Sequence, residues 1–255
     1  MKLTRSVLVL ITLVATVGGR PTTTSAQDVQ AIIEAAWDQF RGQASIARVE
    51  MTIHRPSWER RMTLKSWTQG RTKSLIYIIA PAKDKGNGTL KKDRKMWLFN
   101  PKVNRVIPLP PAMMGQAWMG SDFSNNDLAK SDSLLQDYTH TIIAAEMHEG
   151  RTVYVIKSIP KPDAPVVWGM QKLKIREDHI LLSEEFFDED LQPVRLMTTS
   201  DIQMMGGRLF PKVWKMQKTG SDDEYTLLNH LSLEFPDKLP DRMFTINYLR
   251  RPGRR

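Results

Sequence analysis

The stretch YTLLNHLSLEF, residues 225–235, alternates apolar and polar side chains through most of its length. In an extended strand, successive side chains point to opposite faces, so residues two apart share a face. The stretch therefore predicts a β-strand with one buried face. The predicted inner face consists of Tyr225, Leu227, Asn229, Leu231, Leu233 and Phe235.

The same period of two recurs through most of the chain after Gly42. Short strands at regular spacing, separated by turn residues, are typical of antiparallel barrels. We therefore expect a mainly β fold with a few helices, built as a closed or half-open antiparallel β-barrel. The other predicted strands are residues 48–54, 61–69, 72–79, 95–100, 103–107, 152–159, 172–176, 180–187, 194–204 and 209–218.

Residues 27–40 depart from this period and predict an amphipathic helix. Asp28 can cap its start, and Gly42 can end it. Helical spacing places the apolar side chains on one face, where they can pack against the sheet. That face consists of Ile32, Ile33, Ala36, Trp37 and Phe40.

Residues 108–140 form a second departure, a long insertion that begins with three prolines. Short helices are predicted around residues 125–128 and 132–138, and a terminal helix or edge segment at residues 240–249. A long irregular insertion in a compact domain is often functional.

The first 26 residues predict an export signal. Lys2 and Arg5 precede the apolar run 6–17, and Thr24-Ser25-Ala26 offers a cleavage site after Ala26. The run is too short for a membrane span, which needs about 20 apolar residues. We expect residues 27–255 to form a single soluble, exported domain. The chain has no cysteine, which excludes disulfides and a lipid anchor on an N-terminal cysteine.

The formal net charge of +9 favours anionic partners, such as lipid head groups at a membrane surface. The basic clusters are short, and no nucleic-acid-binding motif accompanies them. We therefore expect transient contact with a membrane surface and no nucleic-acid partner.

The sequence carries no recognised catalytic or cofactor-binding motif. It has no cysteine nucleophile, no G-x-S-x-G elbow, no P-loop and no dinucleotide-binding fingerprint. Its five histidines are scattered, and residues 146–149 are expected to be solvated surface before a hairpin turn at Gly150. We expect no enzymatic activity, no cofactor and no metal.

Four polar residues resemble a cation loop only superficially. They lack the Asp-x-Asp-x-Asp-Gly ladder of a calcium loop, so helix capping by Ser121 or Asp122 and by Asn126 or Asp127 is favoured. The four residues are Asp122, Asn125, Asn126 and Asp127.

Soft apolar residues are abundant, with 14 methionines and 7 tryptophans. Methionine is flexible and suits surfaces that accept varied ligands. These side chains either fill the core or cover an apolar cavity inside a curved sheet, and their position in the proline-flanked insertion favours a lid. Lid residues are expected to contribute little to the packing of the barrel itself. The predicted ligand-binding residues are Met62, Leu64, Trp97, Met113, Met114, Trp118, Met119, Phe123, Leu227, Leu231 and Leu233.

One segment of the insertion carries a resemblance to a known family. Residues 119–128 read MGSDFSNNDL and resemble the signature MGSDFS-x-x-DL of outer-membrane lipoprotein-sorting proteins, relatives of the periplasmic lipoprotein carrier LolA. The resemblance extends from about Phe40 to near the C-terminus. The motif residues are Met119, Gly120, Ser121, Asp122, Phe123, Ser124, Asp127 and Leu128, and further matches are Arg41-Gly42, Pro81, Lys85-Gly86, residues 95–101, Arg105-Val106 and Asp137-Tyr138.

The resemblance implies a half-open antiparallel barrel whose mouth is covered by helices over an apolar cavity. It implies a periplasmic carrier that binds lipid or lipoprotein acyl chains and moves them between membranes or to an inner-membrane transporter. The alternative is a periplasmic protein-interaction or sensor module that uses the same fold without transporting cargo.

Overall fold

The computed structural model describes residues 26–129 and 132–251. The predicted signal peptide, apart from Ala26, lies outside the described residues. Within them, thirteen strands form one antiparallel sheet in the order β6-β5-β4-β3-β2-β1-β13-β12-β11-β10-β9-β8-β7. The strands are β1 (Ala44–Arg55), β2 (Trp58–Gln69), β3 (Lys73–Ala80), β4 (Gly88–Lys92), β5 (Lys95–Asn100), β6 (Arg105–Pro108), β7 (Tyr138–His148), β8 (Arg151–Pro160), β9 (Met170–Arg176), β10 (Leu181–Phe187), β11 (Pro193–Met205), β12 (Arg208–Lys218) and β13 (Tyr225–Glu234).

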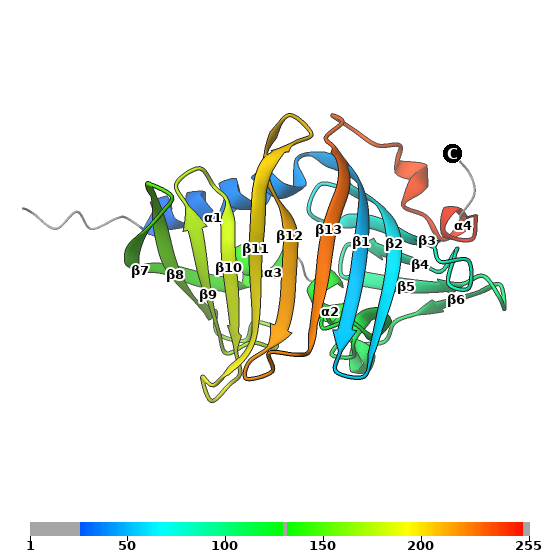
Figure 1. The fold of residues 1–255 in the computed structure, drawn as a ribbon, viewed down its shortest axis with the longest axis horizontal. Helices are drawn as coiled ribbons and strands as arrows, with labels where there is room; N and C mark the ends of the chain where they lie inside the picture. The colour runs from blue at the N-terminus through cyan, green and yellow to red at the C-terminus, as the bar shows by residue number, and fades with distance from the viewer. Residues whose placement is uncertain (1–25, 130–131, 252–255) are drawn as a thin grey trace, which may run out of the picture.

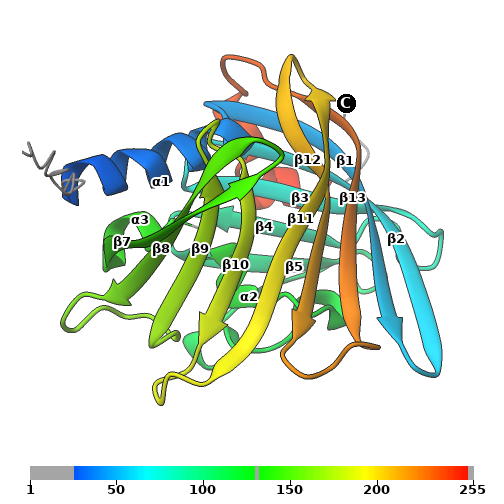
Figure 2. The ribbon, with the colours of Figure 1, turned by 60° about the vertical axis from the view of Figure 1, so that its left-hand side comes forward.

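The sheet is strongly curved but does not close, because β6 and β7 form its two edges and do not pair with each other. Figure 1 shows β3 to β6 running across the direction of the remaining strands. Figure 2 shows these strands passing behind β9 to β13, with helices between the two parts. The expectation of a mainly β fold with a half-open antiparallel barrel is therefore confirmed.

Short helices lie on the concave side of the sheet (Figure 2). The concave side carries most of the buried apolar residues, so each helix can bury an apolar face there. These helices are α1 (Ala26–Arg41), α2 (Asn125–Ala129), α3 (Ser133–Asp137) and the 3-10 helices η1 (Pro111–Met113) and η2 (Trp118–Gly120).

Helix α1 confirms the predicted amphipathic helix and extends it by one residue at each end. Val29, Ile33 and Trp37 recur at intervals of four residues and are buried against the core. Gly42 ends the helix with a φ of +61°, and its N–H donates to the carbonyl of Asp38 at 2.9 Å. Glycine adopts this left-handed conformation without a steric penalty, so its position fixes where the helix stops.

The C-terminal segment packs on the convex side, near β4. It contains η3 (Asp241–Met243) and α4 (Ile246–Leu249), which agree with the terminal helix or edge segment expected at residues 240–249. Leu249 is fully buried against Gly88 and Tyr77, and a Cβ at Gly88 would lie 2.8 Å from Leu249 and 2.7 Å from Tyr77. Only a glycine lets the helix approach the strand this closely.

Two strands were missing from the prediction. Strand β4 is only five residues long and follows the turn-rich segment, and β7 is exposed at seven of its eleven positions. Neither strand therefore shows the alternation that reveals a half-buried strand.

The predicted inner face of residues 225–235 is wrong over its first half. Strand β13 contains a bulge, because Val49 pairs with His230 and Arg48 pairs with Ser232, which leaves Leu231 without a partner on β1. An extra residue reverses the faces on one side of the bulge. Leu228 and His230 accordingly face the interior before the bulge, and Leu233 is buried after it.

No helix among the described residues is long and apolar enough to cross a membrane.

Candidate ligand cavity

A cavity of about 320 Å³ lies between the concave face of the sheet and the helices that cover it. Its walls come from α1, from β1 to β3 on one side, from β9 to β13 on the other, and from the insertion between β6 and β7. It is lined by Trp37, Phe40, Arg41, Val49, Leu64, Ser66, Thr68, Ser74, Ile76, Trp118, Phe123, Asn126, Asp127, Leu128, Ser133, Leu134, Trp168, Gln171, Leu181, Glu184, Phe186, Met197, Trp214, Met216, Leu228 and His230.

Strand β2 illustrates how the sequence forms this wall. Leu64, Ser66 and Thr68 are two residues apart, so all three point to the concave side and line the cavity. The intervening Lys65 and Trp67 point to the convex side, where the Lys65 ammonium lies 5.1 Å from the centre of the Trp67 ring. The wall is therefore apolar near Leu64 and becomes polar towards Thr68.

Residues 117–128, here called the lid loop, cover one side of the cavity with Trp118, Phe123 and Leu128. Trp118 is 4% exposed, and its indole N–H donates to the hydroxyl of Thr89 on β4 at 3.1 Å. The expectation that lid residues contribute little to the packing of the barrel is therefore wrong for Trp118, because this side chain joins the lid loop to the sheet.

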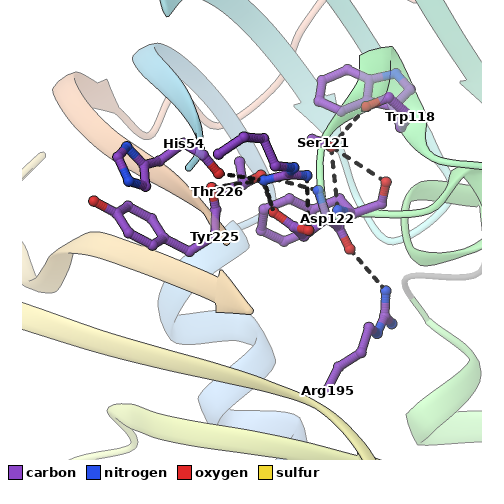
Figure 3. A network of polar contacts seen from close by, with 9 residues as sticks. His54, Trp118, Ser121, Asp122, Arg195, Tyr225 and Thr226 are labelled. Carbon is purple, nitrogen blue, oxygen red and sulfur yellow. Dashed lines mark hydrogen bonds and ion pairs between the residues drawn. The ribbon is translucent and has the colours of Figure 1, made fainter. Parts of the chain in front are cut away.

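A buried polar network binds the lid loop to the two halves of the sheet (Figure 3). Asp122 accepts two hydrogen bonds from the guanidinium of Arg55 at 3.0 and 3.1 Å. The Thr226 hydroxyl donates to the Asp122 carboxylate at 2.7 Å and accepts the Asp122 backbone N–H at 3.0 Å. Because the Asp122 side chain is 1% exposed, these bonds compensate for its desolvation.

Asp127 is held in the same manner by a second arginine. Arg195 on β11 donates to both of its carboxylate oxygens at 2.8 Å, and also to the carbonyl of Asp122 at 3.1 Å. The Arg195 guanidinium packs against two neighbouring rings, 4.5 Å from the centre of Trp168 and 4.6 Å from that of Phe186. The two aspartates of the motif therefore bind arginines that belong to β1 and β11.

Helix α2 begins with a reciprocal cap. The N–H of Ser124 donates to Asp127 at 2.7 Å, and the N–H of Asp127 donates to the Ser124 hydroxyl at 3.2 Å. Ser124 thus acts as the cap in place of the predicted Ser121 or Asp122. No group of three metal-ligating side chains occurs among the described residues.

The predicted ligand-binding residues divide into two sets. Leu64, Trp118 and Phe123 line the cavity, together with Asp127 and Leu128 of the motif. The others lie outside its lining. The adjoining core contains Met62, Met113, Met114, Met119 and Leu233. Trp97 packs against the cluster that contains Tyr77 and Leu249. Leu227 lies on the face opposite Leu228, and Leu231 is 46% exposed.

Polar side chains inside the cavity were not predicted. Burial and, to a smaller extent, the negative charge of Asp127 raise the pKa of Glu184 to about 8, and Arg195 partly offsets these two effects. Burial lowers the pKa of His230 to about 4, although its bond to the backbone of Lys212 opposes this. At neutral pH both side chains are therefore uncharged.

Arg41 supplies the cationic group of the lining. Burial lowers its pKa to about 10, so it keeps its charge at neutral pH. Its Nε and Nη2 donate to the carbonyl of Gly70 at 3.3 Å. The cavity thus combines apolar walls with a few polar groups, as ligand sites in proteins do.

A family of uncharacterized proteins matches residues 70–251, which is most of the chain. The chain belongs to this family. No curated protein matches it in sequence.

Solved structures show that the fold is LolA-like. A DUF1329 family protein from Desulfovibrio piger has a TM-score of 0.76 at 20% identity, with 87% of this chain and 98% of that chain covered. A putative outer membrane lipoprotein-sorting protein domain from Vibrio parahaemolyticus has a TM-score of 0.75 at 22% identity, with coverages of 89% and 100%. A LolA superfamily protein from Nitrosomonas europaea has a TM-score of 0.72 at 22% identity, with coverages of 86% and 98%. The predicted resemblance is therefore confirmed, and the TM-scores show a shared fold.

Proposed function

We propose that this LolA-like protein is a periplasmic carrier that binds an acyl chain of a lipid or lipoprotein in its cavity. It moves the chain between membranes or to an inner-membrane transporter, and it catalyses no reaction. The observation that carries this proposal is the cavity of about 320 Å³, whose lining is mostly apolar and includes four tryptophans and three phenylalanines. The predicted export signal supports the periplasmic location.

The cavity size suits one chain rather than several. Small-molecule sites usually measure about 300–1,000 Å³, so this cavity is near the lower limit. Each buried methylene contributes about 0.8 kcal/mol, and about ten of them correspond to a micromolar dissociation constant before the costs of ordering. Such an affinity permits uptake from a membrane and also release.

A basic recess on the convex side supports contact with an anionic membrane. It contains Lys65, Arg242 and Arg251, together with the rings of Trp67 and Tyr248. Each well-placed cation contributes about 1 kcal/mol at an anionic lipid surface. Replacing Arg242 and Arg251 by Gln should weaken cosedimentation with phosphatidylglycerol vesicles, while the weaker association with phosphatidylcholine vesicles should not change.

Binding of a fluorescent fatty acid to delipidated protein tests the carrier proposal. Wild type should show saturable binding of one chain, and Ser66→Phe should reduce it, because the ring fills the cavity from β2. Thr63→Phe is the matched control, since Thr63 lies on the same strand but on the opposite face from Leu64 and Ser66.

Absence of saturable binding by wild type would reject the carrier proposal. The protein-interaction or sensor module would then be the better proposal. A partner could then pair with the edge strand β7 of this protein, where Ile143 and Met147 are exposed.

A further inference from the structure

Three polar side chains lie in the apolar cavity at neighbouring positions. Asn126 belongs to α2, Gln171 to β9 and Glu184 to β10, and all three line the cavity. They are 8%, 4% and 7% exposed, respectively. The Oδ1 atom of Asn126 and the Oε1 atom of Gln171 are buried and accept no hydrogen bond from the described residues.

Strand register brings these groups together. Gln171 pairs with Phe186, and Glu184 lies two residues before Phe186 on the same face of β10. Gln171 and Glu184 are therefore diagonal neighbours, within reach of a common ligand atom. Asn126 precedes Asp127, whose charge acts on Glu184, so α2 closes this polar recess from the lid side.

The recess is uncharged and contains two amide oxygens, those of Asn126 and Gln171, that lack a donor. Glu184 is protonated at neutral pH because of its burial, and the Asp127 charge is neutralised by its two bonds to Arg195. The amide oxygens of Asn126 and Gln171 can only accept hydrogen bonds. A buried acceptor without a donor costs free energy, so a ligand that supplies a donor gains relative to one that does not.

We propose that the recess formed by Asn126, Gln171 and Glu184 binds an uncharged hydrogen-bond donor of the cargo, a hydroxyl or an amide N–H. This inference rests on the proposed carrier function and adds a selectivity to it. The donor group enters the cavity together with the apolar chain. A carboxylate or phosphate offers only acceptors to these amide oxygens, and an ester offers no donor.

Competition among four ligands of equal chain length tests this inference. Dodecanol, dodecanamide, methyl dodecanoate and dodecanoate each displace the uncharged probe N-phenyl-1-naphthylamine from delipidated protein. The alcohol or the amide should displace it at a concentration about tenfold lower than the ester, which is the usual effect of one satisfied buried hydrogen bond. Comparing the alcohol with the amide identifies which donor the recess prefers.

Variants at the recess assign the preference to named side chains. Gln171→Leu and Glu184→Leu should bring the ratio between donor ligand and ester close to one, while ester binding stays the same. Glu184→Gln should keep the preference, because the amide still presents an acceptor. Met197→Leu is the matched control, since it changes a cavity side chain beside Glu184 without removing a polar group.

The outcomes separate this inference from the carrier proposal. Equal displacement by all four ligands, or tighter binding of dodecanoate, would overturn the inference and leave the carrier proposal standing. A donor preference that persists in both leucine variants would likewise overturn it. Failure of all ligands and of the probe to bind would overturn the carrier proposal as well.

Discussion

Replacing Glu184 by Gln should remove the loss of stability that the protein suffers between mildly acidic and alkaline pH. Burial raises the pKa of Glu184 in the folded chain from its ordinary value of 4.5 to about 8. Below pH 4.5 the folded and unfolded chains both carry the proton, so the group adds no dependence on pH. Between pH 4.5 and 8 the folded chain keeps a proton that the unfolded chain has released, so stability falls as pH rises.

The size of this effect follows from the two pKa values. One pKa unit corresponds to 1.36 kcal/mol, so raising the pKa from 4.5 to about 8 gives at most about 5 kcal/mol above pH 8. A glutamine side chain at this position has nearly the same shape as the protonated acid and does not titrate. The free energy of unfolding of the variant should therefore equal that of wild type within about 1 kcal/mol at pH 4.5 and exceed it by several kcal/mol at pH 9.

Urea unfolding at a series of pH values, followed by tryptophan fluorescence, measures this difference. The matched control is Glu185→Gln, because Glu185 lies on the opposite face of β10 and binds Lys172. Parallel stability profiles of wild type and Glu184→Gln from pH 4.5 to 9 would refute the reasoning. They would mean that Glu184 is ionised in the folded chain, and the uncharged recess would be refuted too.

Three further predictions test other parts of the structure. Burial lowers the pKa of His230 to about 4, so the contribution of its neutral form to stability is complete above pH 6.5 and should be lost as pH falls towards 4. Acid unfolding of His230→Gln should therefore begin at lower pH than that of wild type. Asp122→Ala should cost about 3–5 kcal/mol in urea unfolding because it removes the carboxylate that neutralises the largely buried guanidinium of Arg55, whereas Asp223→Ala, at a 73% exposed side chain, should change stability by less than about 0.5 kcal/mol. Leu233→Lys should abolish folding, and Leu231→Lys should leave the melting temperature nearly unchanged; equal effects of the two would reject the bulge in β13.

The architecture could be predicted because alternation and helix ends depend on local residues. Strand β8 and helix α1 each bury one face, and that face is visible as a period of two or of nearly four in the sequence. The same argument explains the failures. Strand β7 buries little besides Tyr138, and β4 is too short to show a period, so tertiary pairing alone defines both strands.

The choice of inner face could not be predicted for β13. Alternation identifies two faces but does not reveal an extra residue that reverses them. Leu228 and His230 line the cavity because Leu231 is unpaired in the register with β1. Placing that bulge requires the neighbouring strand, and the sequence of β13 alone does not contain it.

The polar recess was beyond prediction for a related reason. Asn126, Gln171 and Glu184 come from three elements that meet only when the sheet curves around the lid loop. In sequence, Glu184 is indistinguishable from the adjacent Glu185, which forms an ion pair with Lys172 on the other face of β10. Strand order and sheet curvature, which are global properties, turn one of these two acids into a buried group.

The motif and the recess therefore have separable roles in the molecule. Asp122 binds Arg55 and Thr226, and Asp127 binds Arg195, so both carboxylates are occupied by bonds that fix the lid loop. Carboxylate oxygens that already accept these hydrogen bonds have few free acceptor positions for a ligand. The two motif carboxylates thus account for how the lid loop is attached, and under the carrier proposal polar selection among cargoes comes from other residues of the cavity. Asn126, which occupies one of the variable positions of the motif, is the point at which the lid can take part in that selection.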